Sequence, residues 1–167
     1  MIGGRRLKEF QKIYEEYAKP VYRFLLSMTA DEDLAEELLA ETFYKALRHI
    51  DRFEGRCSIY TWLCRIGKNE YFRERRRSRR LVQMPSGESV TADDVVSMEE
   101  RAEDRDVYCR AAKAVDRLPE PYREVFVLHT FGEIKLKEIA DLKGKSESWA
   151  RVTYFRARQM IAKEVTE

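Results

Sequence analysis

Apolar residues recur at helical spacing in both halves of the chain, and one aperiodic stretch separates these halves. Near the N-terminus Leu7, Phe10, Tyr14, Tyr17 and Val21 follow one another at steps of three or four residues, which is typical of one face of an α-helix. Glycine and proline are scarce, with 7 and 4 copies in 167 residues, so few positions interrupt helices. The sequence therefore predicts an all-α fold of two small helical domains joined by a flexible linker.

The first domain is expected to span residues 1–80. Pro20 lacks the amide hydrogen that a helix interior needs, so we expect two helices before residue 30. Asp31 is a suitable N-cap for a third helix, which continues to about residue 50. The loop DRFEGRCS follows at 51–58, and Ser58 is a suitable N-cap for a helix that runs from about residue 59 into an arginine-rich segment.

Residues 81–105 mix Pro, Ser, Gly and acidic residues without periodicity, which predicts a linker. The second domain, residues 106–167, ends in KLKEIADLKGKSESWARVTYFRARQMI (135–161). Gly144 permits a tight turn there and Ser146 can cap the following helix, so this stretch predicts a helix-turn-helix. In that motif a short helix braces a second one that enters the DNA major groove. An ordinary helical hairpin with a basic outer face is the alternative.

Charge is segregated along the chain, although the formal net charge is only +2. The stretch NEYFRERRRSRR (69–80) holds six arginines within eight positions, directly after two aromatic residues. Aromatic rings can stack on unpaired bases while guanidinium groups bind phosphates, so this stretch suggests a nucleic-acid partner; a solvated basic helix end is the alternative. Residues 31–41 instead hold six acids and no base, which suggests either a basic protein partner or a solvated face.

The sequence gives no sign of an enzyme, a metal site or a cofactor site. It contains no phosphate-binding glycine loop of the G-x-x-x-x-G-K-[ST] or G-x-G-x-x-G type and no H-E-x-x-H. Three cysteines cannot all pair and form no C-x-x-C, so we expect reduced thiols. No apolar run approaches 18 residues, and the N-terminus does not resemble a secretory signal. We therefore expect a cytoplasmic protein without a small-molecule substrate.

Specific residues in both halves resemble one bacterial family. FEGRCSIYTWLCRIGKNEYFRERRR (53–77) resembles region 2 of the extracytoplasmic-function group of RNA polymerase sigma factors, and AEELLAETFYKAL (35–47) resembles that family's polymerase-binding segment. Residues 118–158 resemble region 4, and GKSESWARVTYFRA within them is similar to a Gram-positive subgroup often paired with membrane-anchored anti-sigma proteins. The family pattern in region 2 is met by Phe53, Gly55, Cys57, Trp62, Leu63, Ile66 and Asn69.

The resemblance implies a transcription initiation factor that binds core RNA polymerase, at the beta-prime clamp helices and the beta flap, and directs it to promoter DNA in duplex and single-stranded form. Melting and recognition of the minus-ten element would fall to Phe53, Arg56, Cys57, Ser58, Asn69, Tyr71, Arg73, Arg76, Arg77 and Arg80. The minus-thirty-five element would meet Lys135, Ser148, Arg151, Val152, Phe155 and Arg156. The clamp helices would meet Glu36, Glu37, Glu41 and Tyr44.

An anti-sigma protein would hold the factor at the inner face of the membrane until an envelope or stress signal releases it. Two other hypotheses fit parts of the sequence. The chain could be a stand-alone helix-turn-helix regulator with a dimerising N-terminal domain, which predicts tight binding to a palindromic duplex without polymerase. It could also be a helical adaptor that does not bind DNA, in which case the arginines at 73–80 would be dispensable.

Overall fold

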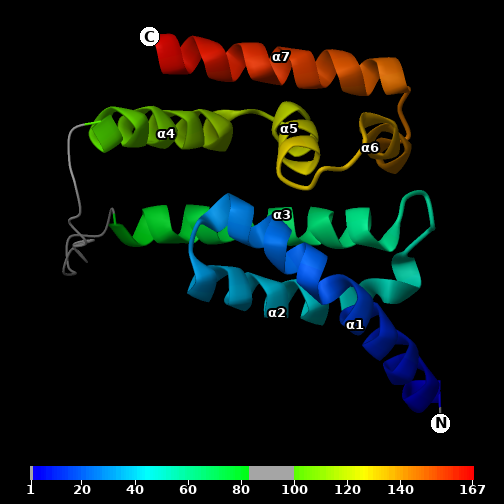
Figure 1. Ribbon diagram of the computed structural model, residues 1–167. Coiled ribbons are helices and arrows are strands. Elements are labelled where there is room, and N and C mark those ends of the chain that lie inside the picture. The colour runs from blue at the N-terminus through cyan, green and yellow to red at the C-terminus, as the bar shows by residue number, and fades with distance from the viewer. Residues whose placement is uncertain (1, 83–99) are drawn as a thin grey trace.

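The structure is a computed structural model that describes residues 2–82 and 100–167 (Figure 1). Most of the predicted 81–105 linker lies outside the described residues. Where its two ends are described, they continue helices rather than coil. The described residues are helical throughout both halves and form α1 (Ile2–Thr29), α2 (Glu32–His49), the short 3-10 helix η1 (Ile50–Arg52), α3 (Ile59–Val82), α4 (Glu100–Arg117), α5 (Tyr122–Thr130), α6 (Leu136–Lys143) and α7 (Glu147–Thr166). The predicted all-α fold is thereby confirmed.

Helices α1, α2 and α3 pack against one another and form the first helical unit. The Asp31 side chain accepts a hydrogen bond from the Leu34 amide at 3.0 Å, so the predicted N-cap of α2 is confirmed. At the start of α3 the Ser58 hydroxyl oxygen accepts from the Thr61 amide at 3.1 Å, as the sequence predicts. Gly67 lets α3 approach its neighbours closely, because a Cβ there would lie 3.1 Å from Leu25 Cδ2.

The predicted break at Pro20 is wrong, because α1 continues through this residue as one helix. Phe10 lies before the proline and Val21, Phe24 and Leu25 follow it, and all four side chains are buried in the same core. A proline inside a helix costs about 3 kcal/mol. Burying each large apolar side chain contributes about 1.5–3 kcal/mol, so packing on both sides of Pro20 outweighs the cost.

Helices α4 to α7 form the second helical unit, and its last two helices make the predicted helix-turn-helix. Gly144 ends α6 in the left-handed conformation, with φ of 64°, which a residue without a Cβ adopts most easily. The Ser146 side chain caps α7 by accepting from the Trp149 amide at 3.1 Å. Ala150, Thr153 and Ala157 line the buried side of α7, and Trp149 and Tyr154 beside them are partly buried against the core.

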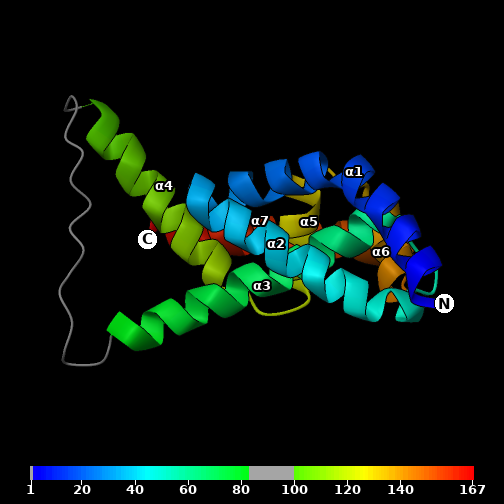
Figure 2. The ribbon, with the colours of Figure 1, turned by 90° about the horizontal axis from the view of Figure 1, so that it is seen from below.

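The two helical units lie against each other along α3. In Figure 1 this helix runs between the α1–α2 pair and the helices α4 to α6, and α7 covers the outer side of the second unit. Figure 2 shows the same stack from below, with the C-terminal part of α3 and the N-terminal part of α4 diverging toward the residues outside the description. Direct packing between the units is made mainly by α3 and α5.

Candidate nucleic-acid and polymerase interfaces

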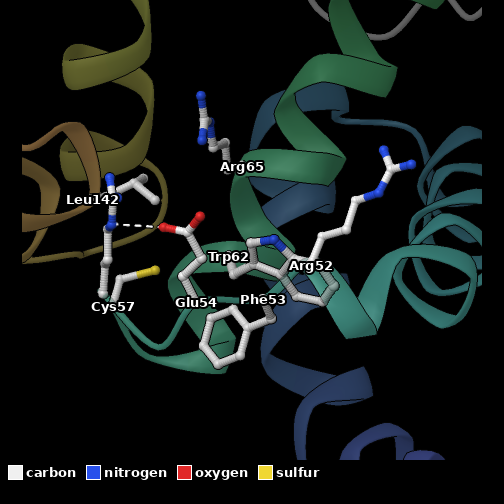
Figure 3. Close-up of a pocket in the computed structure, with 8 residues that line it drawn as sticks. Arg52, Phe53, Glu54, Cys57, Trp62, Arg65 and Leu142 are labelled. Atoms are coloured by element: carbon white, nitrogen blue, oxygen red, sulfur yellow. Dashed lines mark ion pairs between the residues drawn. The ribbon is translucent and has the colours of Figure 1, made fainter.

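A cavity of about 280 Å³ opens beside the loop between η1 and α3 (Figure 3). The ring centroids of Phe53 and Trp62 lie 5.3 Å apart along its side, and Figure 3 shows the two rings next to each other. Gly55 has φ of 71°, so the loop can turn sharply between the charged residues Glu54 and Arg56, which form an ion pair at 2.8 Å. The cavity thus combines aromatic surface with charged groups, a combination that suits an unstacked base and its phosphate. Its lining residues are Arg52, Phe53, Glu54, Arg56, Cys57, Trp62, Arg65 and Leu142.

The predicted minus-ten residues are only partly gathered at this cavity. Phe53, Arg56 and Cys57 line it, and Ser58 follows directly in the chain. Asn69 lies further along α3 as an exposed residue, and Tyr71 lines a different cavity of about 250 Å³ between the two helical units. Tyr71 therefore does not line the cavity beside the loop, because the second unit packs over its side of α3.

Sequence reasoning missed several lining residues, of which Trp62 and Arg65 had a usable signal. The positions 62, 65, 69, 73, 76 and 80 are separated by three or four residues and therefore follow one face of α3. That face leads from the cavity to the arginine-rich segment. Arg52, Glu54 and Leu142 had no comparable signal, since the first two stand in irregular sequence and Leu142 comes from α6, in the other helical unit.

The six arginines of 73–80 have different environments. Arg75 and Arg79 both bind Asp116 of α4, the latter at 2.7 Å, so these two point toward the second helical unit. Arg73 binds Glu70 at 2.5 Å and Arg77 binds Glu74 at 3.3 Å within α3. Arg76 and Arg80 are exposed and make no ion pair within the described part of the chain. Arg75 and Arg79 are therefore the two arginines that α4 binds, although the Arg79 side chain remains 53% exposed.

The outer face of α7 exposes the side chains predicted to read duplex DNA. Val152 and Phe155 are 48% and 59% exposed, which is high for apolar side chains in the middle of a helix. Ser148, Arg151 and Arg156 are exposed as well, and Arg151 is held by Glu147 through a hydrogen bond of 2.6 Å. Lys135 is exposed at the start of α6 and makes no side-chain capping bond there.

The predicted polymerase-binding residues lie on α2. Glu36, Glu37 and Tyr44 are exposed, whereas Glu41 is only half-exposed because it lies 3.8 Å from Lys45 and 3.7 Å from Arg73. Glu41 thus belongs partly to the contact between α2 and α3. A groove of about 550 Å³ runs between α1 and α2, with Glu36 on its edge. The α1 residues of this groove were not predicted from the sequence: Tyr14, Ala18, Lys19 and Tyr22.

Buried charges lie where the two helical units meet. Lys68 of α3 and Glu124 of α5 are each 4% exposed at the side chain, with Nζ and Oε1 3.6 Å apart. Burial lowers the pKa of the Lys68 ammonium, and the nearby Glu124 and Glu120 offset this only partly. Burial alone would raise the pKa of Glu124, but Lys68, Lys143 and Arg65 outweigh it and hold that pKa below its ordinary value. Glu124 is therefore ionised and well compensated, whereas the buried Lys68 charge depends on Glu124 for its compensation.

Cys57, Cys64 and Cys109 are free cysteines, of which Cys64 is buried, Cys57 is half-buried and Cys109 is exposed. Burial raises the pKa of Cys64 to about 12, so its thiolate is scarcely populated near neutral pH. In the described residues, no cluster of three or more His, Cys, Asp or Glu side chains could hold a metal ion. None of the helices in the described ranges has the length and apolar character needed to cross a membrane.

The fold and these surfaces define an all-α protein with a basic helix beside an aromatic cavity and a separate helix-turn-helix. Residues 13–81 match the family described as sigma-70 region 2, and residues 110–161 match sigma-70, region 4. The sigma factor SigM of Bacillus subtilis, an extracytoplasmic-function factor, is 33% identical over 155 residues, which cover 90% of this chain and 91% of that protein. SigX of the same organism is 26% identical, over 93% of this chain and 83% of SigX.

Two solved structures share the fold. The sigma factor RpoE in complex with the anti-sigma factor NepR from Bartonella quintana has a TM-score of 0.55 at 21% identity, with 95% of this chain and 98% of that chain covered. CnrH in complex with the cytosolic domain of CnrY has a TM-score of 0.53 at 20% identity, covering 94% and 87% of the two chains.

The chain therefore belongs to the extracytoplasmic-function sigma factors of the sigma-70 family, which are transcription initiation factors. Both sigma regions are matched in order, which supports sigma-factor function. The matches do not support the stand-alone helix-turn-helix regulator that the sequence left open. The hypothesis of an adaptor that does not bind DNA has no support from these matches either.

Proposed function

We propose that this protein binds core RNA polymerase and directs it to promoters that carry two separated elements. The observation that carries the proposal is the pair of accessible basic surfaces on different helical units. One is the row on α3 that leads from the loop cavity to Arg76 and Arg80, and the other is the outer face of α7 with Arg151 and Arg156. Each surface has exposed or cavity-lining aromatic residues beside its arginines, namely Phe53 and Trp62 on the first unit and Phe155 on the second.

The chemistry of the two surfaces suits two forms of DNA. An open cavity lined by aromatic rings can hold a base that has left the stack, and unstacking costs about a few kcal/mol that ring contacts offset. Phe53, Arg56, Cys57 and Ser58 would hold such a base, with Trp62 as an additional ring. Arg73, Arg76, Arg77 and Arg80 would bind the phosphates of the melted strand, and the exposed Asn69 would contact the same strand.

The α7 surface instead suits the major groove, which admits a helix and offers guanine edges to arginine. Arg151, Val152, Phe155 and Arg156 would read the minus-thirty-five element, while Lys135 and Ser148 would bind its phosphates. Arg156 also borders a hollow of about 490 Å³ with Ser148, Trp149 and Val152, which gives this face a concave edge.

The acidic face of α2 is the proposed contact with the polymerase. Glu36, Glu37 and Tyr44 are exposed, and Glu36 adjoins the groove between α1 and α2, where Tyr14 and Tyr22 add aromatic surface. Carboxylates at the edge of an aromatic groove suit a basic helical partner such as the beta-prime clamp helices. The second helical unit would meet the beta flap.

We further propose that an anti-sigma protein restrains this factor and holds it at the inner face of the membrane. The support is that two proteins of the same fold, RpoE and CnrH, have been solved in complexes with an anti-sigma factor and with the cytosolic domain of CnrY. Co-purification of the tagged chain with a membrane fraction, lost after the inducing stress, would test this part.

Run-off transcription from a promoter library, with purified core polymerase and this protein, tests the main proposal. We expect initiation on a subset of promoters that share two spaced elements. Arg76→Ala combined with Arg80→Ala should abolish promoter opening. Lys8→Ala combined with Lys12→Ala removes the same charge from exposed positions of α1 and should leave initiation unchanged. Absence of initiation with wild-type protein, or equal activity of the two double variants, would refute the proposal.

A further inference from the structure

The cavity of about 250 Å³ between the two helical units differs in chemistry from the cavity beside the loop. Five helices contribute to its wall, α1 and α3 from the first unit and α4, α5 and α7 from the second. Apart from Ser27 and Asp116, every residue of this wall is apolar or aromatic. The wall of the loop cavity, by contrast, contains four charged side chains. The junction cavity, as the space between the units is named here, therefore favours an apolar occupant.

The side chains around the junction cavity leave it open instead of filling it. Met28, Val115, Phe126, Phe131 and Ile161 belong to its wall, and each of them is only partly buried. Protein interiors contain few voids larger than a water molecule, and an apolar cavity of about 150 Å³ can hold benzene. The junction cavity is larger than that, so it has room for a bicyclic ring system of about ten non-hydrogen atoms.

Aromatic rings give the wall a defined shape. The ring centroids of Tyr71 and Phe72 lie 5.0 Å apart with an angle of 73° between the ring planes. Those of Phe126 and Phe131 lie 6.4 Å apart at 81°. Rings at such steep angles present edges as well as faces, and an aromatic ligand can meet both through edge-to-face and offset contacts. An aliphatic chain of the same size lacks these contacts, so the wall favours a flat ring.

Solvent reaches the junction cavity at its rim. Ser27 of α1 and Ala112 of α4 belong to the wall, and both residues are exposed. The Ser27 hydroxyl donates to the Phe24 carbonyl oxygen at 2.7 Å within α1, so it already has a partner. A ligand can therefore enter here without unfolding a helix. Displacing poorly ordered water by an apolar group favours binding.

The charged residue of the wall limits the class of ligand further. The Asp116 side chain is only 5% exposed, and its carboxylate already binds both Arg75 and Arg79. Two guanidinium groups against one carboxylate leave a net positive charge beside the cavity. A cationic ligand would have to compete with both arginines for this carboxylate, and burying its charge without a partner is costly.

We propose that the junction cavity is a binding site for a small, flat aromatic molecule that carries no positive charge. Such a ligand contacts side chains of both helical units, so its binding stabilises the folded protein by mass action. None of the wall residues belongs to the surfaces assigned to DNA or polymerase under the proposed function. The ligand site therefore does not depend on that function and can be tested without polymerase or DNA.

Titration of the full chain with 5-fluoroindole, followed by fluorine NMR, tests the site. This probe is an uncharged bicyclic ring of the expected size. We expect a dissociation constant of about 0.1–1 mM, which is typical of so small a ligand. The related probe 5-fluorotryptamine carries an ammonium group on the same ring system. It should bind at least about tenfold more weakly, because the Asp116 carboxylate is already paired.

Two variants compare a filled cavity with a matched control. Ala111→Leu adds bulk at a residue of the wall and should weaken binding of 5-fluoroindole at least about tenfold. Ala162→Leu makes the same change at an exposed position of α7 outside the wall, next to Ile161, and should bind like wild type. Far-UV circular dichroism checks that both variants fold. Val115→Phe provides a second filled cavity if Ala111→Leu does not fold.

Methyl NMR with carbon-13-labelled methionine locates the bound probe. Met28 belongs to the wall, whereas Met160 lies outside it and is 37% exposed, although it directly precedes Ile161 in the chain. Ring currents from bound 5-fluoroindole should shift the Met28 methyl resonance and leave that of Met160 unchanged. Met28→Leu assigns the signal.

Several results would overturn the junction site. One is the absence of 5-fluoroindole binding to wild type in the millimolar range, which would mean that the gap between the units closes in solution. Another is equal binding to Ala111→Leu and Ala162→Leu, and a third is a shift of Met160 without a shift of Met28. Binding of 5-fluorotryptamine as tight as that of 5-fluoroindole would refute the proposed ligand class.

Discussion

The buried pair of Lys68 and Glu124 makes a sharp prediction, because its two members do not depend on each other equally. Glu124 keeps Arg65 at 3.0 Å and Lys143 at 2.5 Å when Lys68 is removed. Lys68 keeps only Glu120 at 3.4 Å when Glu124 is removed, and its side chain is 4% exposed. A substitution at Glu124 therefore leaves the buried Lys68 charge with Glu120 alone. A substitution at Lys68 still leaves the Glu124 carboxylate with two cationic partners.

The expected magnitudes follow from this asymmetry. Removing one partner of a buried ion pair costs about 3–5 kcal/mol, whereas replacing both members by apolar side chains of similar volume is often neutral or stabilising. We expect Glu124→Leu to destabilise the protein by about 3–5 kcal/mol and Lys68→Met to change its stability by less than about 1 kcal/mol. The double variant should recover at least about 2 kcal/mol of the loss caused by Glu124→Leu alone.

Urea denaturation followed by circular dichroism measures these changes, and small-angle scattering separates opening from unfolding. If opening the contact between the units costs less than stranding Lys68, then Glu124→Leu will open the protein before it unfolds. A cost for Lys68→Met as large as that for Glu124→Leu would refute the reasoning, as would the absence of any recovery in the double variant. Either result would mean that water reaches this pair.

Three further predictions concern the other surfaces. Arg151→Ala should weaken binding to the minus-thirty-five element by about 1–3 kcal/mol in a duplex binding assay, with little change on unrelated sequences, and an equal loss on all sequences would reassign Arg151 to a phosphate. Glu37→Lys should impair binding to core polymerase in a pull-down while its circular dichroism stays that of wild type, and unchanged affinity would rule out the clamp contact at this position. Alkylation of the native protein at pH 8 should modify the exposed Cys109 first and Cys64 last, because burial raises the pKa of Cys64 to about 12, and rapid loss of the Cys64 thiol would contradict its position in the core.

Local sequence determined much of the fold. The helix of 32–49 follows from its apolar spacing and its cap at Asp31, and the helix-turn-helix follows from Gly144 and Ser146. These signals depend on residues at most four positions apart, so they can be identified without knowing the tertiary structure. The family resemblance likewise depends on motifs that are contiguous in the sequence. The continuity of α1 through Pro20 cannot be identified from local sequence, because it depends on packing against α2 and α3.

Only the tertiary structure decided how chemically identical residues are used. Arg75, Arg76, Arg79 and Arg80 belong to the same basic run, yet the first and third bind Asp116 and the other two make no ion pair within the described residues. The partner lies 37 and 41 positions away from Arg79 and Arg75, and Glu138, which accepts a hydrogen bond from the Ser58 amide, lies 80 positions away from Ser58. The sequence by itself therefore determined the helices, the caps and the basic character of α3. The packing of the second unit decided which of those charges remain available, because a carboxylate so distant in the chain can select its partner only once both units are folded and in contact.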